Sequence, residues 1–382
     1  MLITVITTEY EPHIIGGLGI VATQLSEAMA ARGHEIIVLT KGATGRIEEV
    51  NKQQMRIFKY PCDSEYFSKR TQKFYPDPIL HHLRKMNIHP DLIHVHSIQG
   101  DELVDALVDK YNVPVTYTCH SLISEEGVQT STHKRMEQRQ RHLIEHADHV
   151  ISPSRWQALL LTAKYEAASR KTYVVPNGAT IARHSEIWNE RPLHRLLFVG
   201  RFIHSKCALE TIQALSALQK ENRKVQLDLI GQGGKDYTGL MRREVSQLHL
   251  TPYIRFLGSL PHKEVLKRMQ HTGIVIVPSR KESFGLVALE AMGTATPLVS
   301  TASTGLSDFV TEKTASVITQ STAREIGRAV QKVWKKPDET LHRRYAAYAL
   351  AKQFTWEQIA AQHEEIHAGK HAAFTPTIEN ER

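Results

Sequence analysis

Residues 274–293 read Ile-Val-Ile-Val-Pro-Ser-Arg-Lys-Glu-Ser-Phe-Gly-Leu-Val-Ala-Leu-Glu-Ala-Met-Gly. The first four residues form a short apolar, β-branched run, which predicts a buried strand that ends at Val277. A polar loop follows, and the apolar spacing after it predicts a helix that begins near Phe284. Strand, loop and helix make the repeating unit of a parallel sheet, so this stretch indicates an α/β fold.

The same alternation runs through both halves of the 382-residue chain. In the first half the predicted strands are 2–8, 35–40, 55–60, 92–96, 115–119, 149–152 and 173–175. In the second half they are 196–199, 226–230, 254–257, 274–277 and 298–301. A helix is predicted over 20–32, because its apolar residues share one face and Gly33 suits a left-handed cap.

A chain of this length exceeds what one core usually organises, and a polar stretch between Gly178 and Arg191 interrupts the alternation. We therefore predict two doubly wound, Rossmann-like domains, residues 1–185 and residues 186–354. Ligands bind at the carboxyl ends of parallel strands, so a central cleft between the two sheets is the expected site.

The net charge of +8 is compatible with nucleic acid, an anionic membrane surface or small anionic ligands as partners. The basic stretches 68–73 and 133–142 are interpreted as solvated surfaces, with peripheral membrane contact or a charged acceptor as the alternative. No nucleic-acid partner is expected. No apolar run has the length of a membrane span, and the opening residues are typical of a strand rather than a signal peptide.

The three cysteines, Cys62, Cys119 and Cys207, form no Cys-x-x-Cys pair, which favours a cytoplasmic protein without disulfides or zinc. His94 and His96 share one face of a strand but lack a third metal ligand, so a buried role is favoured. A thiol nucleophile at Cys119 is rejected, because Cys119 and its neighbour on the strand point to opposite faces.

Paired glycines, Gly16 and Gly17, follow the first strand and precede a helix, an arrangement that exposes backbone amides to an anion. The alternative is a flexible loop in which the two glycines only allow the backbone to turn and bind no ligand. A nicotinamide-binding loop is disfavoured, because Gly16 lies eight residues beyond Thr8 and the second strand ends in Thr40-Lys41 without an acid.

Two cations, Arg201 and Lys206, follow the strand 196–199. A guanidinium fork and an ammonium point charge could together neutralise a leaving pyrophosphate, although such residues are also common on surfaces. Glu282 precedes the predicted helix and Glu290 lies within it, where both could accept hydrogen bonds from the hydroxyls of a sugar and a ribose. The apolar neighbours of Glu290 predict that it is buried.

Taken together, these motifs resemble the retaining glycosyltransferases of family 4, which have the GT-B fold of two Rossmann-like domains around a cleft. The resemblance covers nearly the whole chain. It is carried by Gly16-Gly17, the sequence His-Pro-Asp-Leu-Ile-His-Val-His at 89–96, His120, Val-Pro-Asn-Gly at 175–178, Val-Gly-Arg at 199–201, Lys206, the two glutamates and Phe-Thr-Trp at 354–356.

The resemblance implies a donor-binding C-terminal domain and an acceptor-binding N-terminal domain, onto which a closing helix within 355–370 packs back. It implies that Arg201 and Lys206 hold the donor diphosphate, Glu290 the ribose and Glu282 the donor sugar. Gly16 and Gly17 would approach the β-phosphate and the acceptor, and His120 the reacting sugar. The implied catalytic residues are Arg201, Lys206, His120 and Glu282; the implied donor-binding residues are Gly16, Gly17, Arg201, Lys206, Glu282, Ser283, Phe284, Gly285, Leu286, Val287 and Glu290.

The mechanism implied by the resemblance is departure and attack on one face of the sugar, in which the leaving phosphate takes the acceptor proton. Electrostatic stabilisation of that phosphate is then the main catalytic term, and domain closure accompanies donor binding. No side-chain nucleophile, cofactor or metal ion is expected, and the chain has no Asp-x-Asp metal motif.

The chain departs from the family pattern at three positions, of which only the last bears on the donor sugar. Cys207 and Ser283 stand where glycine is usual, and Asp308 stands where glutamate is usual. UDP-N-acetylglucosamine or UDP-glucose is the favoured donor, with GDP-mannose as the alternative. The acceptor hydroxyl is left open among a lipid, a polysaccharide and a small molecule, and an epimerase, a phosphorylase and a non-catalytic binding module remain alternative functions.

Overall fold

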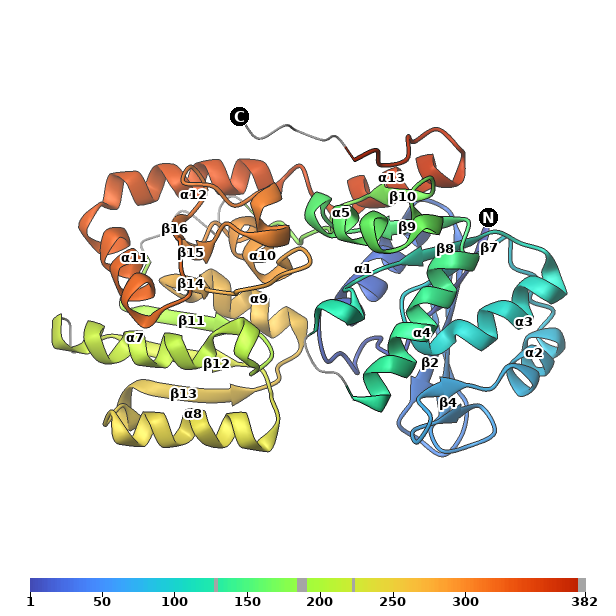
Figure 1. Ribbon diagram of the computed structural model, residues 1–382, viewed down its shortest axis with the longest axis horizontal. Coiled ribbons are helices and arrows are strands. Elements are labelled where there is room, and N and C mark those ends of the chain that lie inside the picture. The colour runs from blue at the N-terminus through green and yellow to red at the C-terminus, as the bar shows by residue number, and fades with distance from the viewer. Residues whose placement is uncertain (127–129, 184–190, 222–223, 377–382) are drawn as a thin grey trace. The chain divides into compact units, whose positions relative to one another are not determined.

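The computed structural model describes residues 1–126, 130–183, 191–221 and 224–376 (Figure 1). The chain forms two compact units: an N-terminal unit of Met1–Gly178 with the segment from Trp356 onward, and a C-terminal unit of Ala179–Thr355. The domain boundary predicted at 185/186 lies outside the described residues.

The N-terminal unit is built on a sheet with the strand order β10-β9-β8-β7-β1-β2-β4-β3. All neighbouring strands are parallel except β3 and β4. The strands are β1 (Leu2–Ile6), β2 (Glu35–Gly42), β3 (Glu48–Lys52), β4 (Met55–Pro61), β7 (Leu92–Val95), β8 (Val115–Thr118), β9 (His149–Ser152) and β10 (Thr172–Val174), with a separate hairpin of β5 (Phe67–Ser68) and β6 (Lys73–Phe74).

Helices cover both faces of this sheet. The helices α1 (Gly17–Ala31) and α13 (Trp356–His367) pack together over the face that carries Ile3 and Val5. The opposite face, which carries Ile6, is covered by α2 (Pro76–Lys85), α3 (Asp101–Tyr111), α4 (Ser131–His146) and α5 (Arg155–Lys164). Successive residues of β1 thus enter two different cores, as the pleat of a strand requires.

The C-terminal unit has a fully parallel sheet with the order β13-β12-β11-β14-β15-β16. Its strands are β11 (Arg195–Val199), β12 (Gln226–Ile230), β13 (Ile254–Gly258), β14 (Ile274–Val277), β15 (Leu298–Thr301) and β16 (Ser316–Ile318). This is the Rossmann order, in which the direction of winding reverses between the first and fourth strands, here β11 and β14.

One face of the C-terminal sheet packs against α7 (Ala208–Glu221), α8 (Lys235–Gln247) and α11 (Ala323–Lys335), and Figure 1 shows α7 and α8 beside β11, β12 and β13. The other face packs against α9 (His262–His271), α10 (Leu286–Gly293) and α12 (Pro337–Ala351). The prediction of two α/β Rossmann-like domains with parallel sheets is confirmed.

Every strand predicted from the sequence is present, but β3, β16 and the two short strands of the β5–β6 hairpin were not predicted. The strand β3 is a polar, largely exposed edge, and β16 has only three residues, so neither gives a clear apolar pattern. The helix α10 begins at Leu286 rather than near Phe284, because Gly285 has a φ of +102° and ends the loop in a left-handed conformation.

A half-buried arginine, Arg191, joins the carboxyl ends of α9 and α10. The Arg191 guanidinium donates hydrogen bonds to the carbonyls of Met269 at 3.1 Å, Thr294 at 2.8 Å and Gln270. Burial, together with the nearby charge of Arg344, lowers the pKa of Arg191 to about 10. Because helix ends leave carbonyls without intrahelical partners, this one cation fixes two helix ends at once.

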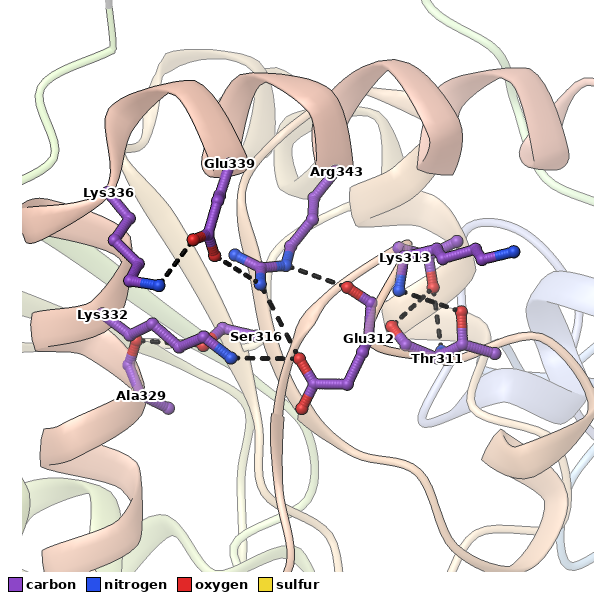
Figure 2. A network of polar contacts seen from close by, with 10 residues as sticks. Thr311, Glu312, Lys313, Ser316, Ala329, Lys332, Lys336, Glu339 and Arg343 are labelled. Carbon is purple, nitrogen blue, oxygen red and sulfur yellow. Dashed lines mark hydrogen bonds and ion pairs between the residues drawn. The ribbon is translucent and has the colours of Figure 1, made fainter.

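An ion network on the C-terminal unit joins the turn after β15 to α11 and α12 (Figure 2). The Glu312 carboxylate accepts from Lys332 at 3.1 Å, and the Glu312 carbonyl accepts from Arg343 at 3.0 Å. Arg343 also contacts Glu339, which pairs with Lys336 on the same helix junction. Exposed pairs of this kind contribute little individually, so the network mainly fixes local geometry.

A row of histidines crosses the N-terminal unit. The rings of His94 and His96 stack at 4.3 Å, and His96 Nδ1 lies 3.0 Å from His120 Nε2. On the other side, His94 lies 5.2 Å from His363 of α13, which is followed by His367 at 6.2 Å. The row therefore links the end of β8 to the C-terminal helix.

Burial lowers the pKa of every histidine in this row, to about 3 for His120 and His363 and to about 4 for His367. For His94 and His96, burial lowers the pKa well below the usual range, and the neighbouring histidines lower it further. Each ring is therefore neutral in the folded protein at neutral pH.

The histidine row should make the N-terminal unit sensitive to acid. Because the folded pKa values lie below the unfolded value of about 6.5, the unfolded chain binds more protons and stability falls as pH decreases below that value. At about one pH unit below 6.5, each histidine that stays neutral in the folded protein lowers the free energy of unfolding by about 1.4 kcal/mol. Urea unfolding at about pH 7.5 and about pH 5.5 measures this loss.

Two variants test the assignment. His363→Gln should shrink the difference in unfolding free energy between the two pH values by about 1 kcal/mol. His81→Gln, at an exposed position on α2, should leave that difference unchanged. Equal pH dependence in the wild type and both variants would show that the buried row does not control acid stability.

Candidate functional site

The sequence-predicted residues of the C-terminal unit lie after β11 and β14, the two strands at which its winding reverses, in the loops that follow these strands and in α10. Arg201 and Lys206 follow β11, and the segment 282–287 follows β14. Loops at such a switch point lead away to opposite faces of the sheet and leave a ligand crevice at its carboxyl edge.

The Lys206 ammonium and the Glu282 carboxylate are in direct contact, with Nζ 2.6 Å from Oε1. The Ser279 hydroxyl donates to the same Glu282 oxygen at 2.8 Å. The side chains of Lys206 and Glu282 are only 18% and 15% exposed, so the ion pair is partly shielded from water. Since an ammonium has three donors, Lys206 keeps hydrogen-bonding capacity for an anion, while Arg201 beside it is exposed.

The backbone of Glu282 is held by the loop after β15. The Glu282 amide donates to Thr304 Oγ1 at 3.0 Å, and the Gly305 amide donates to the Glu282 carbonyl at 2.9 Å. Gly305 must be glycine, because a Cβ would lie 2.2 Å from the Ser283 carbonyl oxygen. The family departure Asp308 lies at the end of this turn, η6 (Thr304–Asp308).

Arg280 joins the loop after β14 to the turn that carries Lys206, η4 (His204–Lys206). Its guanidinium contacts Glu210 at 2.5 Å and the His204 carbonyl at 3.0 Å, and its amide donates to the Ser205 carbonyl at 2.8 Å. These contacts fix the position of Lys206 relative to Glu282.

The predicted residues 283–287 divide into two groups. Phe284 is buried in the core, where its ring packs 5.0 Å from that of Phe309, so its side chain has an anchoring role. Leu286 and Val287 begin α10, and the first amides of a helix have no intrahelical partner. Together with the helix dipole, these amides favour an anion at this end of α10.

Glu290 is 2% exposed, as its apolar neighbours predicted, and its Oε1 lies 2.5 Å from Nε2 of His262. His262 is the first residue of α9 and Glu290 lies in the middle of α10, so the pair joins two helices whose carboxyl ends share Arg191. Sequence reasoning missed His262, Ser279, Thr304 and Arg280. The only sequence signal near His262 is that a proline, Pro261, precedes it at the start of a helical pattern. This signal predicts a helix start and does not by itself predict a functional histidine.

Gly16, Gly17 and His120 lie in the N-terminal unit, also after the carboxyl ends of strands. Gly17 is the first residue of α1, and the Gly16 amide donates to Glu9 Oε2 at 3.0 Å. His120 follows β8, is half-buried and contacts His96. This unit also reverses its winding at neighbouring strands, β1 and β7.

The two basic stretches named from the sequence meet in the N-terminal unit. Arg139 of α4 donates to the Gln72 carbonyl at 2.6 Å. Arg139 also lies 3.6 Å from Asp101, and Lys73 lies 2.8 Å from Glu102, so part of the positive charge is compensated. Contact of this surface with an anionic membrane stays a prediction.

Two further findings concern the described residues. They contain no group of three or more histidine, cysteine, aspartate or glutamate side chains arranged to hold a metal ion, and none of their helices is long and apolar enough to cross a membrane. Burial raises the pKa of the Cys119 thiol to about 12, which makes it a poor nucleophile.

Comparison with known families gives two matches that follow each other along the chain. Residues 182–351 match "Glycosyl transferases group 1", and residues 15–183 match "Glycosyltransferase Family 4". Glycogen synthase from Mycobacterium tuberculosis is 28% identical, with 94% of this chain and 92% of the relative covered. D-inositol 3-phosphate glycosyltransferase from Corynebacterium aurimucosum is 26% identical, with 92% and 91% covered.

Solved structures show the same fold. Sucrose-phosphate synthase from Thermosynechococcus elongatus has a TM-score of 0.75 and 21% identity, covering 96% of this chain and 98% of its own. Anabaena Alr3699/HepE, solved in complex with UDP-glucose, has a TM-score of 0.76 and 18% identity, covering 97% and 100%. At these identities the likeness concerns the fold alone.

The contact between His262 and Glu290 should stabilise the C-terminal unit. His262→Asn leaves the buried Glu290 carboxylate without this partner and should lower the unfolding free energy by about 2 kcal/mol. His271→Asn, at the exposed end of the same helix, is the matched control and should change little. Thermal denaturation of the three proteins measures the effect, and equal stability of both variants would contradict it.

Proposed function

Since the chain belongs to the group 1, family 4 glycosyltransferases, which act on nucleotide sugars, we propose that it transfers a hexosyl group to a hydroxyl acceptor with retention of configuration. The observation that supports this most directly is the contact of Lys206 with Glu282 at the switch point of the C-terminal unit. A cation held there by a fixed carboxylate suits the binding and release of a diphosphate.

In this proposal the C-terminal unit binds the donor. Lys206 and Arg201 neutralise the diphosphate, and the free amides of Leu286 and Val287 add hydrogen bonds to its oxygens. Glu290, oriented by His262, accepts from the ribose hydroxyls. Glu282 holds Lys206 and lies close to the donor sugar.

The same arrangement supports catalysis by stabilisation of the leaving group. As the glycosidic bond breaks, negative charge grows on the phosphate, and a preorganised Lys206 stabilises that charge without reorganising. The leaving phosphate takes the acceptor proton, so no side-chain nucleophile or metal ion is required. His120 has a lowered pKa and therefore contributes a neutral imidazole, which can exchange hydrogen bonds with the reacting sugar.

We infer that the donor is a UDP-sugar, with glucose or N-acetylglucosamine as the transferred group. Support comes from Anabaena HepE, which was solved with UDP and with UDP-glucose. GDP-mannose is the second candidate donor. The relatives' names point to two acceptor chemistries, a glucan and an inositol phosphate. We place the reaction in the cytoplasm, because the three cysteines of the chain form no Cys-x-x-Cys pair.

Nucleotide binding provides the first test. UDP should raise the melting temperature more than GDP or ADP, with and without Mg²⁺, because a ligand that binds only the folded state stabilises it. A larger shift with GDP would favour the mannosyltransferase alternative, and a shift that requires Mg²⁺ would contradict metal independence. The absence of any nucleotide shift would contradict the proposed donor site.

Removing the Lys206 charge tests the catalytic role. Lys206→Ala should lower kcat by about 100-fold to 1000-fold, because the leaving phosphate loses its stabilising cation. Lys220→Ala, an exposed position on α7 of the same unit, is the control and should retain full activity. Transfer of labelled sugar from UDP-glucose to glycogen, maltotriose or inositol 3-phosphate is the assay. Normal turnover by Lys206→Ala would overturn the role, and donor turnover without acceptor would favour an epimerase.

A further inference from the structure

The loop between β1 and α1 is closed by a carboxylate of the chain itself. Glu9 Oε2 accepts hydrogen bonds from the amides of Ile15 at 2.8 Å and Gly16 at 3.0 Å. These are the amides at the start of the glycine pair, where the sequence predicted an anion. The helix α1 has no side-chain cap at Gly16 and no acid in its first turn, so Glu9 supplies the negative charge at this helix end.

Several neighbours hold Glu9 in this position. The Glu9 amide donates to Thr7 Oγ1 at 3.3 Å, and the preceding Thr8 amide donates to Ser97 Oγ at 2.8 Å, which ties the loop to the end of β7. Gly19 leaves room for the side chain, because a Cβ there would lie 2.9 Å from Glu9 Cβ. The Glu9 carboxylate is therefore held in a fixed position within the loop.

The second oxygen of Glu9 has a different environment. Within the described part of the chain, Oε1 has no hydrogen-bond partner, and the residue is half-buried. An ionised carboxylate accepts hydrogen bonds through both oxygens and donates none. Oε1 can therefore accept from a hydroxyl, whereas a phosphate at the same place would meet a like charge and find the two amides occupied.

We propose that Glu9 selects the acceptor: Oε2 fixes the glycine loop, and Oε1 accepts a hydrogen bond from a hydroxyl of a neutral polyhydroxy acceptor. This inference rests on the proposed transferase function. It adds that the loop binds the acceptor through the carboxylate of Glu9. The backbone amides of the loop do not bind a phosphate. Of the two acceptor chemistries named above, it favours the glucan.

Enzyme kinetics test this role with two matched variants. Glu9→Gln keeps a carbonyl oxygen for the amides but places an NH₂ donor where Oε1 accepts. Glu11→Gln removes the same charge from an exposed side chain of the same loop. The wild type should use maltotriose in preference to inositol 3-phosphate. Glu9→Gln should raise the KM for maltotriose about 10-fold or more with a smaller change in kcat, since a hydrogen bond to a charged group is lost.

Glu11→Gln should behave like the wild type, and both variants should keep the wild-type shift of the melting temperature with UDP. A wild-type preference for inositol 3-phosphate, or identical kinetics of the two glutamine variants, would overturn the proposal. A wild type that binds UDP-glucose but transfers to neither acceptor would overturn the choice of a neutral acceptor, whereas failure to bind UDP would count against the proposed function itself.

Hydrogen exchange tests the loop without any acceptor. In the wild type, the peptide that contains Ile15 and Gly16 should exchange slowly and should not respond to inorganic phosphate. In Glu9→Ala it should exchange faster, and phosphate should slow it again by binding the freed amides. Equal exchange in both proteins, or protection of the wild type by phosphate, would show that Glu9 does not occupy the anion position.

Discussion

The reversal of winding in a parallel sheet is the constraint on which the candidate site depends. Parallel strands end at one edge, and only where the winding reverses do consecutive loops leave that edge in opposite directions. In the C-terminal unit this happens between β11 and β14, whose loops carry Lys206 and Glu282. The N-terminal unit repeats the arrangement between β1 and β7, where Ser97 holds the start of the Glu9 loop.

Three charged groups at these edges have a partner within their own unit. Lys206 contacts Glu282, Glu290 contacts His262, and Glu9 accepts from two backbone amides. A partly buried charge without a partner would be costly, so the site must be compensated before any ligand arrives. The partner also fixes geometry. A ligand then meets groups that are already oriented, which lowers the entropic cost of binding.

The sequence was sufficient to predict the fold and to propose candidate ligand-binding residues, because strand periodicity and a family motif are local signals. It was insufficient for the partners of those residues. His262 and Thr304 lie 28 and 22 residues along the chain from the groups they contact, and nothing local marks them. The amides near Gly16 were predicted to bind an external anion, but the amides of Ile15 and Gly16 already donate to the carboxylate of Glu9, earlier in the same loop.

Cys207 shows how a departure from the family pattern can be read once the backbone is known. It follows Lys206 directly and has a φ of +58°, a conformation in which glycine carries no steric cost. The strain is tolerated because Cys207 is fully buried and its carbonyl accepts from Thr211 of α7. A glycine at this position would relax the turn but would lose the buried side chain. The cysteine therefore couples the position of Lys206 to the packing of α7, so the orientation of this cation depends on the core beneath it.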